Sequence, residues 1–489
     1  MAYANDAAAI EELHEVVSRQ RSAFLADPFP SLDERRTLLG ALAGMVMSHR
    51  SEIEEAMSTD FGVHPTLATD LIEVLGVAGR AAYVAEHLDG WMAPEPRYSD
   101  PALYGSGRAY VQPQPKGVVG NISPWNFPFD LSVGPLVEML AASNRVVLKP
   151  SEHTPACARV LQEMIRATFA RERVDVVVGG LELAKAFTRV RWDHLLYTGS
   201  PEIGREIAKA AAEQLVPVTL ELGGKCPAIL TNDSIDGESV KQVLGTKALK
   251  NGQMCISVDY CLVPRQRMDD FARLAVDHVH ENMPDFYCSP NNTGIITTRH
   301  LERIRRLIED AQTRGCDVRA LEESGEIDAD TRRQLPMSIV LDPPDDLALM
   351  QEEIFGPILP VKAYDELDEA IRHVNAGERP LALYVFSKDE QMASGSAATH
   401  HFRRRVRERS RGARCPAVGA LRRHRAERHG PPSRYRGLPR VLQPARGLRA
   451  GRRRHDRGVR SAVRRDCTGR GWCGFRAAQQ LTPGSLEAP

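Results

Sequence analysis

The first four hundred residues alternate between stretches with a helical and stretches with a strand-like spacing of apolar positions. Apolar residues such as Leu38, Leu42 and Met45 recur every three or four positions. Residues 11–60 and 66–90 are therefore predicted to form amphipathic helices, each with one apolar face.

Short runs rich in β-branched residues follow, and each run ends in Gly, Pro or Ser. They lie at residues 117–123, 144–150, 174–180 and 194–200, with helical stretches at 131–143 and 154–170 between them. Strands that alternate with helices at this spacing favour a parallel, doubly wound α/β sheet that is covered on both faces. In such sheets, dinucleotides bind at the carboxyl ends of the strands.

Length and composition set the class of protein. The chain has 489 residues, which predicts two or three domains, and 42% hydrophobic with 26% charged residues is typical of a globular protein. No stretch has the roughly 18 consecutive apolar residues of a membrane span, and the N-terminus lacks a signal-peptide pattern. We therefore expect a cytoplasmic protein without membrane contact. The nine cysteines form no CxxC pair, so neither a metal site nor a disulfide framework is predicted.

The net charge of zero conceals a break near residue 400. Residues 401–489 contain 25 Arg, no Lys and 5 acidic residues, a balance of +20, whereas residues 1–400 carry −20. This Arg-rich tail also loses the apolar periodicity seen upstream. The tail is either a disordered basic arm for nucleic acid or a segment that is not the natural end of the protein.

Three residues are candidates for chemistry, and each has a plain structural alternative. Cys255, in "GQMC", is either a buried core thiol, the commoner state of a free cysteine, or a nucleophile. Glu221 ends an apolar run before two glycines, so it is either a desolvated general base or an exposed turn residue. Asn126, in "SPWNFP", is either a turn residue or a fixed amide donor.

Two further signals are weak when taken alone. Gly199 and Gly204, in "TGSPEIG", stand at a strand-to-helix turn, which can cradle a phosphate or can be ordinary turn chemistry. Lys149 and Glu152, in "LKPSE", could bind ribose hydroxyls or form a solvated charge pair.

Taken together, these residues resemble the NAD(P)-dependent aldehyde dehydrogenases. Over residues 20–392 the chain contains, in the order of that family, the motifs "SPWNFP", "LKPSEHTP", "YTGSPEIG", "LELGGK", "GQMC" and "EEIFGP". The resemblance implies a Rossmann-type parallel-sheet cofactor domain, an α/β catalytic domain and a small oligomerisation arm. The implied boundaries are 1–90 with 114–222 for the cofactor domain, 91–113 for the arm, 223–392 for an incomplete catalytic domain and 393–489 for the tail.

The resemblance also assigns roles to the candidate residues. Cys255 attacks the aldehyde as a thiolate, the Asn126 amide holds the oxyanion, and Glu221 activates the water that hydrolyses the thioester. The family's positions for cofactor contacts correspond to Trp125, Lys149, Glu152, Gly199, Ser200, Gly204, Glu353 and Phe355. Because a carboxylate at Glu152 repels a 2′-phosphate, NAD is favoured over NADP.

The sequence says less about the substrate and the partners than about the reaction. The resemblance is greatest to the coniferyl-aldehyde branch, so an aromatic or medium-chain aldehyde is expected. The alternatives are an acylating, CoA-dependent enzyme and a cofactor-binding protein without catalysis. The intact protein is expected to be a homodimer or homotetramer that binds no nucleic acid.

Two residues depart from the family pattern: Lys250 stands where Asn is frequent, and Ser143 stands where Gly is frequent.

The tail lacks the closing motifs of the family, but a shifted reading frame restores them. If the coding DNA uses GC-rich codons and is read one base later, the codons of residues 420–428 can encode "PFGGIGPSG" and those of residues 428–447 can encode "GMGHHRGTEGFLEFFSPRG". The codons of residues 400–409 can likewise encode "TTSGGVCVND". We therefore hypothesise a frameshift between about residues 388 and 400. The Arg-rich tail would then be disordered or non-native, and the chain as written could lack activity.

Overall fold

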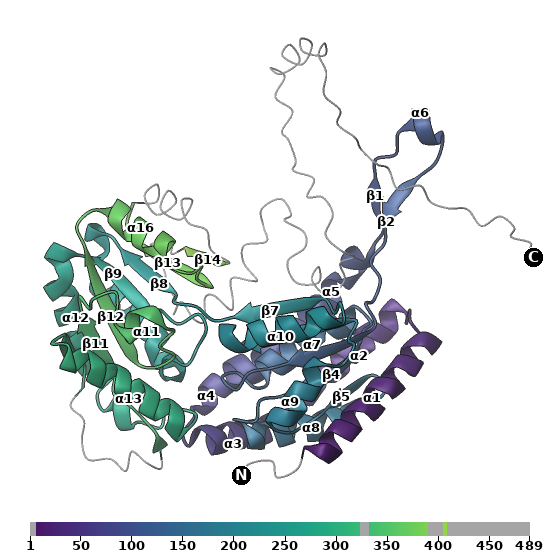
Figure 1. Ribbon diagram of the computed structural model, residues 1–489, viewed down its shortest axis with the longest axis horizontal. Coiled ribbons are helices and arrows are strands. Elements are labelled where there is room, and N and C mark those ends of the chain that lie inside the picture. Colours follow the sequence, from purple (N-terminus) through teal and green to yellow (C-terminus); the bar gives the residue numbers. More distant parts are fainter. Residues whose placement is uncertain (1–5, 323–331, 390–403, 408–489) are drawn as a thin grey trace, which may run out of the picture. The chain divides into compact units, whose positions relative to one another are not determined.

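The computed structural model describes residues 6–322, 332–389 and 404–407 of the chain. These residues all fall within one compact unit, Met1–Gln443. They form a five-stranded sheet, a seven-stranded sheet and a two-stranded hairpin, with helices beside the two larger sheets (Figure 1). The predicted α/β fold is confirmed.

The N-terminal segment is helical, as its apolar spacing predicts. Its elements are α1 (Ala7–Ala26), α2 (Leu32–Ser48), α3 (Arg50–Phe61), α4 (Thr66–Thr69), the π-helical turn η1 (Asp70–Val74) and α5 (Leu75–Met92). Residues 11–60 thus divide into three helices. The second begins with a capping box: the Ser31 hydroxyl accepts a hydrogen bond from Glu34 N, and the Glu34 carboxylate accepts one from Ser31 N at 2.6 Å.

The five-stranded sheet is entirely parallel. Its strands are β3 (Val118–Ile122), β4 (Arg145–Lys149), β5 (Val174–Val176), β6 (His194–Gly199) and β7 (Val218–Leu222), in the order β5-β4-β3-β6-β7. The connecting helices are α7 (Asp130–Ala141), α8 (Pro155–Thr168), α9 (Leu181–Thr188) and α10 (Pro201–Glu213). Strand order reverses between β3 and β6, so the loops after these two strands diverge at the carboxyl edge, where ligands bind in such sheets.

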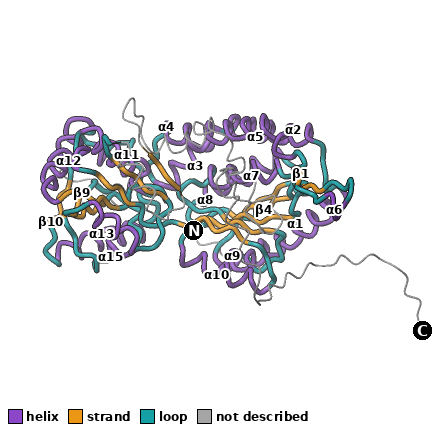
Figure 2. The backbone as a smooth tube through the Cα atoms, turned by 90° about the horizontal axis from the view of Figure 1, so that it is seen from above, coloured by secondary structure: helices purple, strands orange, loops and turns teal. Residues whose placement is uncertain are grey.

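Both faces of this sheet are buried, which explains its nearly continuous apolar strands. Val119 and Val146 pack in a core with residues of α2, α5, α7 and α8, whereas their neighbours Val118 and Val147 pack with residues of α1 and α9. Figure 2 shows helices on either side of the strands.

Ser143, between α7 and β4, has a φ of 64°. This is the left-handed region, which favours glycine, the residue that is frequent here in the family that the chain resembles.

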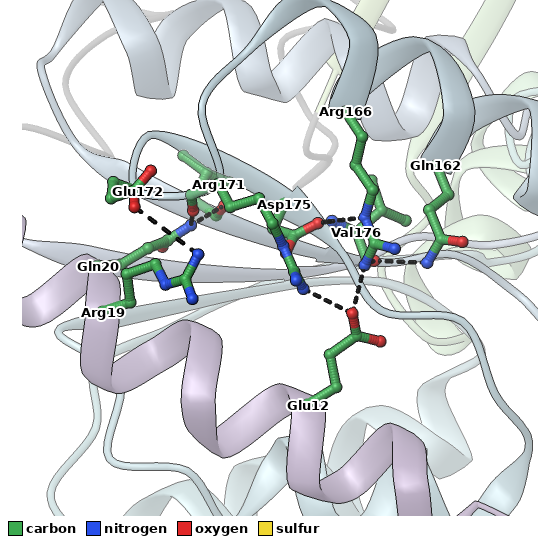
Figure 3. A network of polar contacts seen from close by, with 10 residues as sticks. Glu12, Arg19, Gln20, Gln162, Arg166, Arg171, Glu172, Asp175 and Val176 are labelled. Atoms are coloured by element: carbon green, nitrogen blue, oxygen red, sulfur yellow. Dashed lines mark hydrogen bonds and ion pairs between the residues drawn. The ribbon is translucent and has the colours of Figure 1, made fainter.

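The edge strand β5 is shorter than the run 174–180 predicts. Gly180 N donates to the Asp6 carboxylate at 2.8 Å instead of continuing the sheet. A charged network beside β5 ties it to two helices (Figure 3): buried Asp175 accepts hydrogen bonds from Arg166 and Arg171, and both guanidinium groups also bind Glu12 of α1. This network closes the edge of the sheet with α1.

A small hairpin at residues 95–111 lies within the segment 91–113, for which the sequence predicts an arm. Strands β1 (Glu95–Arg97) and β2 (Ala109–Val111) pair antiparallel, and the short helix α6 (Pro101–Tyr104) lies between them. Large apolar side chains of the hairpin are exposed, with 85% of Tyr98 and 76% of Leu103 accessible to solvent.

The seven-stranded sheet has the order β10-β11-β12-β9-β8-β13-β14. Its strands are β8 (Pro227–Leu230), β9 (Tyr260–Pro264), β10 (Asp317–Ala320), β11 (Ser338–Leu341), β12 (Ile358–Tyr364), β13 (Ala382–Phe386) and β14 (Arg404–Arg407). All neighbouring strands are parallel except β10 and β11.

Helices also cover both faces of this second sheet. They are α11 (Gly237–Ala248), α12 (Met268–Asn282), α13 (Thr298–Thr313), α15 (Ala348–Gln351) and α16 (Leu367–Ala376), with short 3-10 turns η2 (Asn232–Ser234), η3 (Leu249–Gly252), η4 (Arg265–Arg267) and η5 (Phe286–Cys288). Among the described helices, none is long and apolar enough to cross a membrane.

The second sheet extends beyond the predicted end of the catalytic segment at residue 392. Strand β14 pairs in parallel with β13, Ala382 opposite Arg404 and Val385 opposite Arg407. The sequence predicts no strand here, since this segment lacks an apolar pattern. The rest of the predicted tail, 393–403 and 408–489, lies outside the described residues.

Candidate active site

The loop that carries Cys255 connects α11 with β9 and has an unusual backbone. Lys250, Asn251 and Gly252 are all left-handed, with φ of 55°, 53° and 75°. A Cβ atom on Gly252 would lie 2.2 Å from the carbonyl oxygen of Gly356, so only glycine permits this close approach. The loop is therefore packed directly against the "EEIFGP" segment.

Cys255 differs from the buried cysteines around it. Cys157, Cys226 and Cys261 are at most 1% exposed, and burial raises the pKa of each of these thiols. Cys255 is only partly buried and lies in a turn before β9. Its accessibility fits the nucleophile interpretation better than the core-thiol interpretation.

Gln253, two residues before Cys255, holds this loop through all its polar atoms. Its side-chain Nε2 donates to the carbonyls of Lys250 and Gly294, both at 3.0 Å, while its Oε1 accepts from Ile296 N at 3.0 Å. Gln253 belongs to the motif "GQMC", but the sequence indicates no role for it, because two of its three partners lie about forty residues away. A buried amide that is satisfied in this way fixes the turn that presents Cys255.

Asn126 lies in the loop after β3 and points at the Cys255 loop. It is 3% exposed, and its Nδ2 donates to the backbone carbonyl of Gln253 at 3.2 Å. Its own backbone carbonyl accepts a hydrogen bond from the Lys250 ammonium. Since an amide carries two N–H donors, the bond to Gln253 leaves one for a substrate oxygen.

Glu221 is the next-to-last residue of β7 and is half-buried. Gly223 and Gly224 then turn the chain toward β8, and φ of Gly224 is 158°. Directly after this turn, Cys226 Sγ donates to the carbonyl of Cys255 at 3.3 Å. The segment that follows Glu221 is thus in direct contact with the candidate nucleophile.

Lys225, the last residue of "LELGGK", and Asp259 join that motif to the "EEIFGP" segment, and sequence reasoning missed both residues. The Lys225 ammonium binds the Asp259 carboxylate and donates to the carbonyls of Leu349 and Glu352, at 2.8 and 2.9 Å. Asp259 in turn accepts from Ile354 N at 3.0 Å. A lysine at the end of one motif and an aspartate in the apolar run after Cys255 are a signal for such a role, but their partners cannot be identified from the sequence alone.

Glu353 is directed into the interior beside this network. Its Oε1 is buried and has no hydrogen-bond partner among the described residues. A Cβ atom on Gly223 would lie 2.0 Å from its Oε2. Burial, followed by the negative charge of Asp259, raises the pKa of Glu353 to about 8.

Aromatic rings connect the loop after β3 with the "EEIFGP" segment. The rings of Trp125 and Phe355 meet edge to face with centroids 5.3 Å apart, and Phe355 has a φ of 51°. His300 also packs on Trp125, at 5.2 Å, and on His153, at 5.6 Å. Burial, then the charges of His153 and Arg303, lowers the pKa of His300 to about 4. Sequence reasoning did not identify His300, which lies in no quoted motif.

The remaining predicted cofactor contacts lie at the carboxyl ends of β4 and β6. Lys149 is 1% exposed and donates to Glu152 at 2.7 Å, so the predicted pair exists but is not solvated at its ammonium end. Ser200 caps α10 by accepting from Ile203 N. Gly199 and Gly204 are tightly packed, since Cβ atoms there would meet Tyr197 at 2.2 Å and Leu222 at 2.8 Å.

These residues fit a dinucleotide. Two glycines and the N-terminus of a 13-residue helix lie at the strand-order reversal, where a pyrophosphate binds in such folds. Lys149 and Glu152 lie at the end of β4, and the Glu353 oxygen lacks a partner among the residues that the structure describes.

The chain matches known proteins over most of its length. The model of the aldehyde dehydrogenase family matches residues 3–402. A probable coniferyl aldehyde dehydrogenase of Caulobacter vibrioides is 42% identical over 381 residues, which cover 77% of this chain and 79% of that protein. The coniferyl aldehyde dehydrogenase of Pseudomonas sp. strain HR199 is 37% identical over 380 residues, or 78% of both chains.

Solved structures agree with these sequence matches. Substrate-bound AldH of Staphylococcus aureus superimposes with a TM-score of 0.75 at 30% identity, covering 81% of this chain and 84% of that one. The NAD+ complex of an aldehyde dehydrogenase of Mycobacterium tuberculosis gives a TM-score of 0.72 at 26% identity, covering 81% and 82%.

Glu353→Gln is expected to change how stability depends on pH. Because the folded state raises the pKa of Glu353 to about 8, it retains a proton that the unfolded chain releases near pH 4.5. Raising the pH from about 4.5 to 8 therefore lowers the free energy of unfolding of the parent protein, whereas the neutral Gln variant does not lose this stability. The parent's melting temperature should fall relative to that of the variant between about pH 5 and 8 and then run parallel to it.

The neighbouring Glu352→Gln provides the matched control, because the side chain of Glu352 is half exposed. Its melting temperature should follow that of the parent across the whole range. Identical pH slopes for the parent and Glu353→Gln would contradict the burial of a protonated carboxyl group at residue 353.

Proposed function

Because the chain belongs to the aldehyde dehydrogenase family, we propose that Cys255, Asn126 and Glu221 are the residues with which it oxidises an aldehyde to the carboxylic acid. Its family and relatives make it an NAD(P)-dependent aldehyde dehydrogenase. The observation that carries the assignment is the hydrogen bond from the Asn126 amide to Gln253 in the Cys255 loop. This bond links a buried amide donor in the loop after β3 to the turn that carries the partly exposed Cys255, which supports the assignment.

The proposed chemistry begins with attack of the Cys255 thiolate on the aldehyde carbon. The remaining N–H of the Asn126 amide and the backbone N–H of Cys255 stabilise the oxyanion. When bound, NAD(P)+ supplies the acceptor for the hydride that this adduct loses. Glu221 then removes a proton from the water that attacks the thioester, which frees the acid and restores the Cys255 thiol.

Glu221 also argues against the acylating alternative. A carboxylate at the end of β7, whose following segment contacts Cys255, suits the activation of water rather than thioester transfer to CoA. A cofactor-binding protein without catalysis would bind NAD but release no acid. Measuring NAD binding and acid formation on the same sample separates this alternative from both enzymes.

We propose NAD as the preferred cofactor. Burial raises the pKa of Glu152, but the Lys149 ammonium together with a backbone hydrogen bond and His153 outweighs this effect, so the pKa lies below its usual value. The carboxylate is therefore charged at neutral pH and would repel the 2′-phosphate of NADP. A higher kcat/KM for NADP than for NAD would contradict this preference.

The proposed substrate is an aromatic aldehyde such as coniferyl aldehyde, or a medium-chain aldehyde. Two relatives that share 37% and 42% of their aligned residues bear the name coniferyl aldehyde dehydrogenase. Residues 60–62, "DFG", are part of the resemblance to the coniferyl-aldehyde branch. Asp60 caps α8 by accepting from Ala156 N and Cys157 N, which gives this segment a structural role. Turnover limited to short semialdehydes would contradict the substrate proposal.

The hairpin of β1 and β2 is proposed to bind a second copy of the chain in a homodimer or homotetramer. It exposes Tyr98, Leu103, Tyr104 and Tyr110 together, and exposed apolar patches of this kind mark association sites. Light scattering of the Tyr104→Asp/Tyr110→Asp variant should give a smaller particle than the parent protein does.

Cys255→Ala should abolish acid formation and leave NAD binding intact. Without the thiolate, the first covalent step cannot occur, so turnover should fall by at least about a thousandfold. NADH absorbance measures turnover, and calorimetry measures binding. Cys288→Ala is the matched control, since Cys288 is also a partly buried free thiol but donates to Asp285 O in another loop. The proposal fails if Cys255→Ala retains turnover while Cys288→Ala behaves like the parent.

The frameshift is tested on the coding DNA from codon 380 to the stop. We expect an added or missing base between about codons 388 and 400, because three family motifs reappear in one shifted frame. The chain with the corrected frame should then be assayed beside the present one. A clean sequence in the present frame would contradict the frameshift, and little turnover would then be expected.

A further inference from the structure

Lys250 is a fully buried lysine beneath the candidate site. Its side chain is 1% exposed and forms an ion pair with Glu73, which is 0% exposed, at 3.4 Å. The ammonium also lies over the rings of Phe61 and Phe127, 4.6 and 4.4 Å from their centroids. Burial lowers the pKa of Lys250 and raises that of Glu73, and each charge partly offsets the effect on the other.

Glu73 connects this lysine to the loop that carries Asn126. It lies in the π-helical turn η1, and such turns are frequent at functional sites. Its Oε2 accepts hydrogen bonds from the backbone N–H groups of Phe129 and Asp130, at 3.0 and 2.7 Å. Glu73 therefore holds the end of the 124–130 loop where α7 begins.

Lys250 itself binds the other part of that loop. Its ammonium donates to the backbone carbonyl of Asn126. The backbone carbonyl of Lys250 accepts a hydrogen bond from Gln253 Nε2. The backbone carbonyl of Gln253 in turn accepts a hydrogen bond from the Asn126 amide. Lys250 thus contacts both the peptide of the amide donor and the turn before Cys255.

We propose that Lys250 is a positioning residue that fixes the Asn126 amide relative to Cys255. The inference rests on the oxyanion role proposed for Asn126. The directional bond to the Asn126 carbonyl orients the peptide, while Glu73 neutralises the buried ammonium and holds the same loop at residues 129 and 130.

The test compares Lys250→Met, Glu73→Gln and the double variant with the parent. Lys250→Met keeps the length of the side chain but removes the ammonium, so kcat should fall about 10- to 100-fold, as expected for a small displacement of a catalytic group. NAD affinity should remain within about twofold. The exposed Lys241→Met is the matched control and should keep the parental kcat.

The double variant separates positioning from a purely structural role. Lys250→Met alone leaves a buried carboxylate without its cation, and the added Glu73→Gln removes that charge, so the melting temperature should recover. The kcat should stay low, because the Asn126 carbonyl still lacks its donor. Recovery of kcat together with stability would overturn the inference.

Hydrogen exchange of the unliganded protein tests Lys250 independently of turnover. Amides of residues 126–131 should exchange faster in both Lys250→Met and the double variant, with amides of the five-stranded sheet unchanged. Unchanged exchange at residues 126–131 would overturn the inference even if the protein is active. If the chain as written is inactive, kcat is compared in the chain with the corrected reading frame. An inactive corrected chain with faster exchange in these variants would refute the proposed function and leave the contact of Lys250 established.

Discussion

The left-handed turn at residues 250–252 is the constraint on which the candidate site depends. Three successive residues with positive φ bring the Cys255 loop against Gly356, with a glycine at the closest point. Two of the three are not glycine, and their backbone strain must be offset by contacts. Lys250 supplies these through Asn126 and Glu73, and Gln253 supplies them through residues 294 and 296. The turn therefore forms only where several distant segments meet.

The architecture of the cofactor domain could be predicted from the sequence, because local patterns determine it. The strands at 118–122, 145–149 and 194–199 lie inside the predicted runs, since β-branched residues buried on both faces leave a clear pattern. The strand at 174–176 ends early because its partner β4 ends at Lys149, and the Asp6 carboxylate, far away in sequence, then binds Gly180 N. Strand β14 could not be predicted, since pairing with β13 and not its own pattern defines it.

The sequence predicts the motifs of the candidate site but not the contacts between them. Cys255, Glu221, Asn126 and Glu353 belong to short motifs whose order identified the family, although their roles remain proposals. Lys225, Asp259 and His300 were missed because their partners lie on other loops. The spacing of residues along the chain carries no information on such contacts, whereas it does carry information on helices and strands.

Lys225 and Lys250 share a physical reason for their positions. Apolar contacts would bury these loops equally well, but they are not directional and would leave the position of a carbonyl or an amide undetermined. Lys225 and Lys250 each use one ammonium for a carboxylate and for backbone carbonyls of a second loop. A buried ion pair contributes little net stability, because desolvation offsets the attraction, yet breaking it is costly. Such pairs therefore serve geometry. Lys225 joins the segment after β7 to the "EEIFGP" segment, and Lys250 joins the loop that carries Asn126 to the turn before Cys255.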